Sequence, residues 1–387
     1  MIEVTEKQNC CGCTACVAVC PKNCIEMKED MEGFLYPEVD QSSCIHCNAC
    51  DRVCPILNVK ERKPFEQSAY IVQNKDVEVL RESTAGGAFT AIAKYVIHNS
   101  GVVFGVELNK NLEAHHIYVE DVTELKRFRN SKYVQSSVGG TLRKVKFFLE
   151  QGKTVCFSGT PCQIEGLKCY LKKDYENLIT VDVVCRAVPS PLIFRKYVEL
   201  QKQELEDDIK TVRFRDKYYG YKYSTMNVVT DRNHGNYHQG VESDPWLRAF
   251  FSNICDRPSC HNCHFRNQYR VSDFTIWDCF HAGRFSKELD NDKGATRVLV
   301  HTDKGRRIFE AIKDDFSYVE VKPEEAVAGA KEMQESVKPH EQRQVFFEDA
   351  NKLSGSQLFY KYFPSTFRVK AEHFVRTACY KMGIYSL

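Results

Sequence analysis

Two short segments near the N-terminus carry cysteines at identical spacing, a pattern typical of metal ligation. Each run has the form C-x2-C-x2-C-x3-C-P, and each cysteine of the second run lies 34 positions after its counterpart. This spacing binds two 4Fe–4S clusters in ferredoxin modules, where the fourth cysteine of each run ligates the cluster of the other run. We therefore assign the first cluster to Cys10, Cys13, Cys16 and Cys54. The second cluster is assigned to Cys44, Cys47, Cys50 and Cys20.

Zinc is the alternative metal, because C-x2-C pairs also bind zinc tetrahedrally. Two identical runs of four cysteines, each followed by a proline, are more than a zinc site uses, so the clusters are favoured. The chain has 19 cysteines, and in a reducing compartment such crowding indicates metal ligation rather than disulfides. Cys11 and Cys24 fall outside both runs, and we expect them to pack rather than to bind metal.

Further cysteines follow much later in the chain. Cys162 lies in a turn of small residues after an apolar segment, and Cys185 ends another. Cys260 and Cys263 form a C-x2-C pair, which needs two more ligands from elsewhere. A small zinc site that uses a neighbouring histidine, His261 or His264, is the local alternative.

A turn of small residues also precedes a predicted helix at positions 88–98. Such a turn lets backbone N–H groups approach a ligand, and the start of a helix favours an anion such as a phosphate. An ordinary helix start capped by Ser83 or Thr84 explains the same residues. Neither G-x-G-x-x-G nor a Walker sequence occurs, so a standard nucleotide-binding motif is not supported.

The order of these motifs resembles the coenzyme F-420 hydrogenase/dehydrogenase β-subunit family. The resemblance covers about residues 1–320 and also rests on Asn130 to Ser136, Asp273 and Gly294 to Thr296. Members are iron–sulfur flavoproteins. The resemblance implies a third 4Fe–4S cluster held by Cys162, Cys185, Cys260 and Cys263, with Cys255 in reserve for Cys162.

The same resemblance implies bound FAD, with Lys132 as the catalytic residue that stabilises negative charge on the reduced ring. A surface lysine is the ordinary alternative. The implied FAD-binding residues are Ser83, Thr84, Ala85, Gly86, Gly87, Ser131, Lys132, Tyr133, Gly159, Thr160 and Asp273. Two segments depart from the family pattern: Cys185 is followed by Arg186 and Ala187 instead of His-Gly, and residues 277–281 replace Gly-Asp-Phe-Trp-Gly. We therefore expect ferredoxin to be a better electron partner than the deazaflavin coenzyme.

Strand-like and helix-like segments alternate after residue 68, which predicts an α/β fold with a mixed sheet. Strands are expected at 69–73, 102–107, 154–158, 179–185 and 297–301. Helices are expected at 88–98, 142–150 and 305–313, and a hairpin within 211–230. Four regions follow: a ferredoxin domain (1–60), two parts of a flavin-binding domain (61–150 and 151–325, the second with the inner cluster) and a helical basic tail (326–387).

Composition limits the class of function. The 387 residues carry 54 Lys and Arg against 52 Asp and Glu, for a net charge of +2, which argues against a nucleic-acid binder. No apolar run is long enough for a transmembrane segment, and the first residues lack the pattern of a signal peptide, so we expect a cytoplasmic protein. The basic, aromatic-rich end from residue 357 is expected either to pack on its own domain or to dock on a membrane surface or partner.

The sequence therefore predicts an FAD-dependent oxidoreductase that links ferredoxin or a deazaflavin carrier to a small organic substrate. The protein's part is to bind and orient the cofactors. A non-catalytic electron-transfer subunit of a larger redox complex is the alternative. The chain is expected to associate either with a partner redox subunit or with further copies of itself.

Overall fold

The computed structural model describes residues 1–232 and 237–384. The N-terminal region forms a small module with two short helices, α1 (Ala15–Val19) and α2 (Ala49–Arg52), and an antiparallel hairpin of β1 (Ile25–Glu29) and β2 (Leu35–Val39). The cysteine repeat is also a repeat of backbone shape. Gly12 and His46 both have a left-handed φ, and so do Thr14 and Asn48, which directly precede the two helices.

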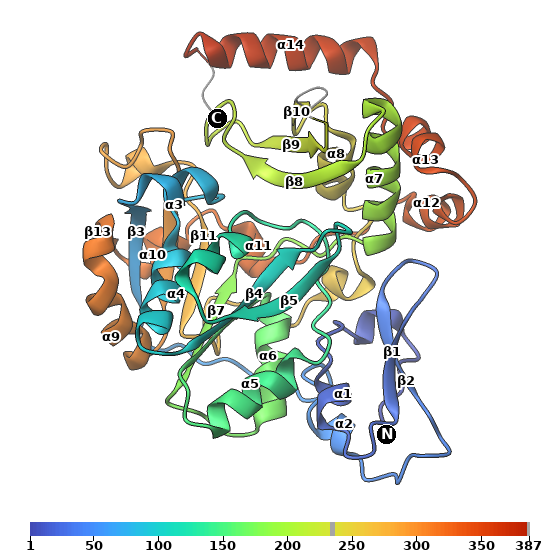
Figure 1. The fold of residues 1–387 in the computed structure, drawn as a ribbon, viewed down its shortest axis with the longest axis vertical. Helices are drawn as coiled ribbons and strands as arrows, with labels where there is room; N and C mark the ends of the chain where they lie inside the picture. Colours follow the sequence, from blue (N-terminus) through green and yellow to red (C-terminus); the bar gives the residue numbers. More distant parts are fainter. Residues whose placement is uncertain (233–236, 385–387) are drawn as a thin grey trace.

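An eight-stranded mixed sheet forms the centre of the molecule (Figure 1). Its order is β13-β3-β12-β11-β7-β6-β4-β5, and β11, β7, β6 and β4 run parallel while the outer strands are antiparallel. The strands are β3 (Ser68–Asn74), β4 (Val102–Leu108), β5 (Ala114–Val119), β6 (Val155–Gly159), β7 (Leu178–Val183), β11 (Phe274–Asp278), β12 (Thr296–Val300) and β13 (Phe316–Val321).

Helices cover both faces of this sheet because successive side chains of each strand point to opposite faces. Val103 and Cys156 pack with α4 (Ala88–His98) and α9 (Asp303–Ile312). Phe104 and Phe157 pack on the other face with α5 (Thr141–Glu150) and α6 (Pro161–Leu171). Shorter helices at the periphery are α3 (Val77–Glu82), α10 (Pro323–Val327) and α11 (Lys331–Gln334), with 3-10 turns at 7–9, 122–128, 258–262, 282–284 and 313–315.

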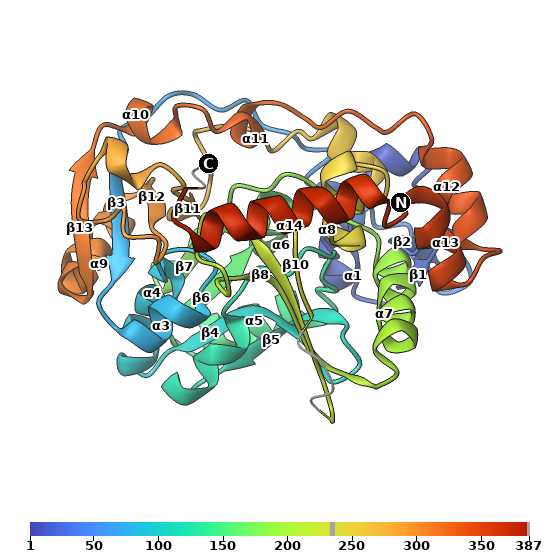
Figure 2. The ribbon, with the colours of Figure 1, turned by 90° about the horizontal axis from the view of Figure 1, so that it is seen from above.

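A second core forms around α7 (Pro191–Leu205) and the three-stranded antiparallel sheet of β8 (Ile209–Asp216), β9 (Thr225–Thr230) and β10 (Tyr237–Gly240). Helices α8 (Pro245–Ser252), α12 (Arg343–Ala350) and α13 (Gly355–Tyr362) complete it. The last helix, α14 (Phe367–Lys381), lies outside this three-stranded sheet, and none of its residues is buried (Figures 1 and 2).

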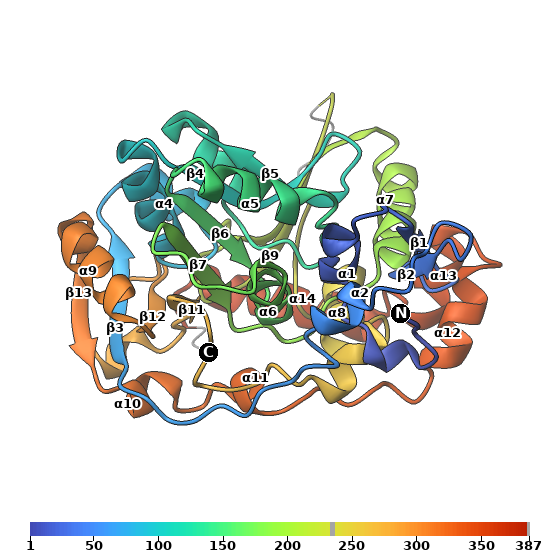
Figure 3. The same ribbon diagram turned by 90° about the horizontal axis from the view of Figure 1, so that it is seen from below.

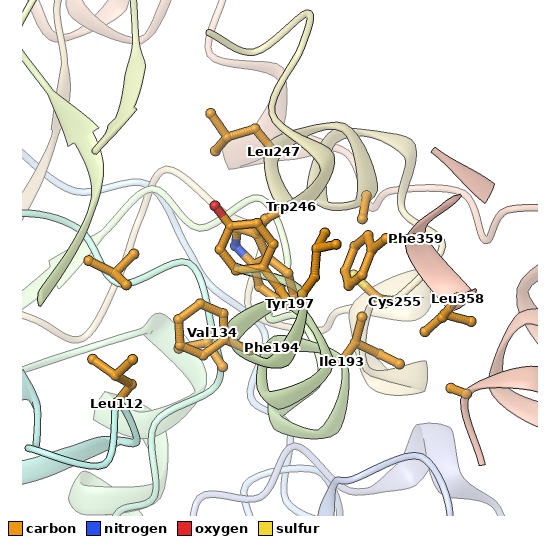
Figure 4. Packing of buried hydrophobic residues seen from close by; sticks show 14 of the residues in the cluster. Leu112, Val134, Ile193, Phe194, Tyr197, Trp246, Leu247, Cys255, Leu358 and Phe359 are labelled. Atoms are coloured by element: carbon orange, nitrogen blue, oxygen red, sulfur yellow. The ribbon is translucent and has the colours of Figure 1, made fainter. Parts of the chain in front are cut away.

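The N-terminal module packs against both cores (Figure 3). Cys13 and Ala15 belong to the same buried cluster as α6. Phe34, from the loop between β1 and β2, belongs to the second core, whose centre is Phe194 stacked edge-on against Trp246 at 5.0 Å between ring centroids (Figure 4). The module is therefore an integral part of the fold.

The predicted α/β class is confirmed, and so are most of the predicted elements. The helix expected at 88–98 is α4, and each expected strand differs from the observed one by one or two residues at its ends. The strand expected to reach Cys185 ends at Val183, because its pairing with β6 ends at Asp182 and its pairing with β11 ends at Val183. Helices α6 and α7 and strands β5 and β11 were not predicted. Among the described residues, no helix combines the length and the apolar character that a bilayer crossing requires.

Gly166 provides a test of the contact between α6 and the module. A Cβ added there would lie 2.6 Å from Cys13 Cβ and 2.8 Å from its Sγ. Alanine is the better helix former, yet we expect Gly166→Ala to destabilise the protein by about 1–3 kcal/mol through overpacking. Thermal unfolding measures this effect. Gly140→Ala is the control, since nothing lies within 4 Å of its Cβ position. A Gly166→Ala protein more stable than the wild type would contradict the close contact between α6 and Cys13.

Candidate functional site

Three cavities in the structure are lined by cysteines. The outer cavity lies between the two halves of the module and is lined by Cys20, Cys24, Cys44, Cys47 and Cys50. The middle cavity is lined by Cys10, Cys11, Cys13, Cys16 and Cys54. The inner cavity is lined by Cys11, Cys162, Cys185, Cys260 and Cys263. Each cavity thus brings together the four cysteines that the sequence assigned to one cluster, together with one further cysteine.

The donor set fits iron–sulfur clusters. Burial raises the pKa of Cys16 to about 12, and burial together with Cys162 and Cys263 raises the pKa of Cys185 to about 12. Such thiols stay neutral unless a metal ion stabilises the thiolate. Among the described residues, no three His, Cys, Asp or Glu side chains converge closely enough for one metal ion. The four thiols of each cavity instead surround it, as the separate irons of a cubane require.

Neighbouring parallel strands position two of the inner cysteines. Strands β6 and β7 end at the same edge of the sheet, where ligands of α/β folds commonly bind. Cys162 lies in the first turn of α6, directly after β6, and Thr160 and Gln163 form a capping box that fixes where this helix starts. Cys185 follows β7. The 3-10 turn at 258–262 completes the cavity with Cys260 and with Cys263 after it.

Two arginines lie at the inner cavity, and one of them, Arg270, is already paired with a carboxylate, that of Asp182. Arg270 is buried, and its Nη1 lies 2.9 Å from Asp182 Oδ1 and 3.0 Å from the Val183 carbonyl oxygen. Arg266 donates to the carbonyl oxygens of Glu332 and Arg186. Both line the cavity. Sequence reasoning missed them because neither belongs to a cysteine motif.

Three cysteines outside the motifs do not lie where the sequence analysis expected them. Cys11 was expected only to pack, but it lines both the middle and the inner cavity. Cys24 lines the outer cavity, with its Sγ 3.4 Å from that of Cys20. Cys255, the reserve ligand, lies instead in the second core and does not line the inner cavity. Cys11 is therefore the fifth thiol at the inner site.

Most of the residues predicted to bind FAD lie in two stretches, 83–87 and 131–133, and the first packs against β3 and β12. The Ser131 N–H donates to Thr84 Oγ1 at 2.7 Å, so the two predicted stretches touch. The Gly86 N–H donates to Thr296 Oγ1 at 2.7 Å. A Cβ on Gly86 would lie 2.3 Å from the Val72 carbonyl oxygen. This glycine is therefore required by the packing of the turn against β3 and β12, and its N–H already has a partner.

Lys132 is held by the main chain. Its Nζ donates to the carbonyl oxygens of Arg127 at 3.0 Å and Arg129 at 2.9 Å. Burial, aided by the positive charge of Arg213, lowers the pKa of Lys132 to about 7. At neutral pH this side chain therefore exists in both protonation states.

A polar cluster that the sequence did not indicate lies beside Lys132. The Tyr133 hydroxyl accepts a hydrogen bond from Arg215 Nη1 at 3.0 Å, and the same nitrogen lies 3.1 Å from Asp278 Oδ2. The Arg215 side chain is buried, and its Nη2 has no hydrogen-bond partner among the described residues. An orphaned guanidinium N–H is a donor available to an anionic ligand.

Three predicted residues lie outside those two stretches. Asp273 precedes β11, whereas Asp278 ends it, so the two residues lie at opposite ends of this strand. Asp273 Oδ2 accepts from the Thr180 N–H at 2.8 Å, and its Oδ1 accepts from Thr302 Oγ1 at 2.7 Å, which ties β7 to the start of α9. Gly159 and Thr160 lie at the end of β6, and Thr160 lines the inner cavity.

Comparison with known families agrees with this arrangement. Residues 152–327 match the model of the C-terminal region of the coenzyme F420 hydrogenase/dehydrogenase beta subunit, and residues 9–57 match a 4Fe–4S dicluster domain. One similar solved chain comes from the xenon-derivatised F420-reducing [NiFe] hydrogenase complex of Methanosarcina barkeri. It shares 16% identity with a TM-score of 0.46, over 80% of this chain and 97% of that one. No curated protein matches.

The inner cavity can be tested with matched cysteine substitutions. Cys260→Ser removes one of the four predicted ligands, so we expect the protein to lose about four irons, the content of one cubane. Cys255→Ser is the control, because this thiol is buried but does not line the cavity. Iron and acid-labile sulfide are measured after anaerobic purification. Equal iron loss in both variants would show that the cavity does not define the ligands.

Proposed function

We propose that this chain, which carries the C-terminal domain of the coenzyme F420 hydrogenase/dehydrogenase β-subunit family behind a 4Fe–4S dicluster domain, is an iron–sulfur flavoprotein oxidoreductase. It relays electrons between a low-potential carrier and a small organic substrate. The observation that carries the proposal is the series of three cysteine-lined cavities leading from the surface of the module to the edge of the central sheet.

The order of the cavities suits a relay. The outer cavity includes Cys47, whose side chain is exposed, so a carrier can approach it closely. The middle and inner cavities share Cys11 and Ile56 in their walls, so little protein separates them. When bound, 4Fe–4S clusters supply one-electron transfer. The chain fixes their spacing by packing the module against α6.

The FAD-binding part of the proposal rests on the group around Thr84, Ser131 and Lys132. When bound, FAD supplies hydride chemistry that combines two single electrons. Lys132, fixed by two carbonyl oxygens, places an amine where it can stabilise negative charge. Arg215 offers its unpartnered Nη2 to an anionic group. These residues orient the cofactor and hold charge beside it, while Gly86 maintains the turn.

Ferredoxin is the favoured carrier. Arg186, which stands where the family often has His, donates through Nη2 to Asn253 Oδ1 at 2.9 Å and to the Phe251 carbonyl oxygen at 3.1 Å. This side chain therefore fills the space after Cys185 and is tied to the end of α8. The substitution supports a carrier that acts through the outer cavity rather than a deazaflavin bound beside the flavin.

The protein purified without oxygen should contain about twelve irons, at four per cubane, and one FAD. Reduced ferredoxin should bleach the flavin absorbance faster than reduced deazaflavin does. Cys47→Ser should slow this reduction and lower the iron content, because it removes a ligand at the entry point. Stopped-flow absorbance measures the rates, and Cys379→Ser, far from the cavities in sequence and on α14, is the control.

Two outcomes would overturn parts of this proposal. Faster reduction by the deazaflavin would reverse the choice of carrier. Full iron content without any flavin would favour the alternative, a non-catalytic electron-transfer subunit.

A further inference from the structure

One arginine lies between the middle and inner cavities without a carboxylate partner. Arg257 is fully buried, and within the described residues no Asp or Glu forms an ion pair with it. An isolated buried charge is strongly unfavourable unless something nearby compensates it. The structure must therefore provide the balancing negative charge in another form.

The side chain of Arg257 points into the N-terminal module. Its Nε donates to the Cys10 carbonyl oxygen at 2.8 Å, and its Nη2 donates to the Leu35 carbonyl oxygen at 2.9 Å. The same Nη2 lies 3.6 Å from Cys10 Sγ. The guanidinium also lies 4.3 Å from the centre of the Tyr36 ring. The thiol of Cys10, a predicted ligand in the middle cavity, thus lies next to this cation and can become an anion.

The main chain of Arg257 bonds to two residues that line the inner cavity, Val188 and Cys260. Its carbonyl oxygen accepts the N–H of Cys260 at 2.9 Å, and its own N–H donates to the Val188 carbonyl oxygen at 3.0 Å. Its Nη1 donates to Gln135 Oε1 at 2.9 Å, and Gln135 donates in turn to the Cys11 carbonyl oxygen at 3.2 Å. One residue therefore contacts predicted ligands or their neighbours in both cavities.

We propose that Arg257 sets the reduction potential of the middle cluster, an inference that rests on the proposed function. A positive charge and a hydrogen bond at a cluster sulfur stabilise the reduced, more negative state, so they raise the potential. With the clusters bound, Cys10, Cys13, Cys16 and Cys54 would hold the middle one, and Arg257 would favour its reduced form. The electron would come from the ferredoxin-type carrier, which would itself be oxidised.

Redox titration of the whole protein, followed by electron paramagnetic resonance, tests this role. Arg257→Gln should lower one of the three potentials so that the ratio of reduced to oxidised cluster falls about tenfold, which is 59 mV for one electron. Arg257→Lys keeps the charge but cannot make all of the contacts, so a smaller shift in the same direction is expected. The other two potentials should stay unchanged.

Arg143→Gln is the matched control. Arg143 also holds the module, through the carbonyl oxygens of Ala18 at 2.9 Å, Val17 at 2.8 Å and Cys20 at 3.3 Å, but among the described residues no cysteine sulfur accepts from it. If Arg257→Gln does not fold, Arg257→Lys must still show the shift. Unchanged potentials at full iron content would overturn the role of Arg257 and leave the proposed function intact, whereas a wild-type protein without clusters would remove the function itself.

Helix α14 carries a second, independent inference. One side faces the body of the protein, where His373 Nδ1 lies 2.7 Å from Glu242 Oε1 and Thr377 Oγ1 lies 3.3 Å from the Tyr223 hydroxyl. The opposite side carries an apolar stripe of Phe367, Phe374 and Met382, which are 88%, 74% and 63% exposed. Figure 2 shows this helix lying along the outside of the molecule.

Basic residues flank the stripe. Arg368, Lys370 and Lys381 are exposed, and Glu372 is the single acidic residue of the helix. An apolar stripe between cations is typical of helices that lie in the interface of an anionic membrane. We propose that α14 docks the protein on an anionic lipid surface, with the phenylalanines among the acyl chains and the cations at the headgroups.

Co-sedimentation with vesicles tests this surface. The protein should bind vesicles that contain phosphatidylserine at least tenfold more strongly than vesicles of phosphatidylcholine alone, and added salt should weaken the binding. Phe374→Glu should abolish it, whereas Phe147→Glu, an exposed position on α5, should not. Absence of binding would overturn the proposal. So would a wild-type dimer that Phe374→Glu converts to a monomer, because the stripe would then be a contact between copies.

Discussion

The contact between the N-terminal module and the edge of the central sheet determines how the three cavities are placed. At Gly166 the helix α6 approaches Cys13 so closely that no side chain fits between them, and Arg257 reaches from the segment before Cys260 into the loop of Cys10. These contacts couple a local motif to a distant part of the chain. Without them nothing would fix the two cavities of the module relative to the inner cavity.

The second constraint on the cavities is the balance of charge between buried thiols and arginines. Twelve thiols predicted as ligands line cavities with few carboxylates, and burial raises the pKa of several of them. Such sites are stable only when metal ions balance the thiolates. Arg257, Arg266 and Arg270 are buried or partly buried around the middle and inner cavities. Arg270 is paired with Asp182, whereas Arg257 and Arg266 form no ion pair among the described residues and would supply positive charge to anionic clusters in a medium of low polarity.

The proposed flavin site is organised differently. Ser131 is bonded to Thr84, the neighbouring Lys132 is held by the carbonyl oxygens of Arg127 and Arg129, and Arg215 has a donor with no partner among the described residues. Gly86, which resembled a phosphate-binding glycine, is instead required where the turn packs against β3. Small residues at a helix start thus have two explanations that sequence spacing does not separate, because close packing and ligand approach both exclude a side chain.

The sequence by itself determined the features that depend on local spacing: the two cysteine runs, the helix at 88–98, the alternation of strands and helices, and the C-x2-C pair at 260. Tertiary structure alone decided which distant residues meet. It placed Cys11 in the walls of two cavities, Cys255 in the second core, and Asp273 at the end of β11 opposite to Asp278. Spacing fixes the geometry of neighbours within a turn or strand, whereas contacts between segments depend on how whole elements pack.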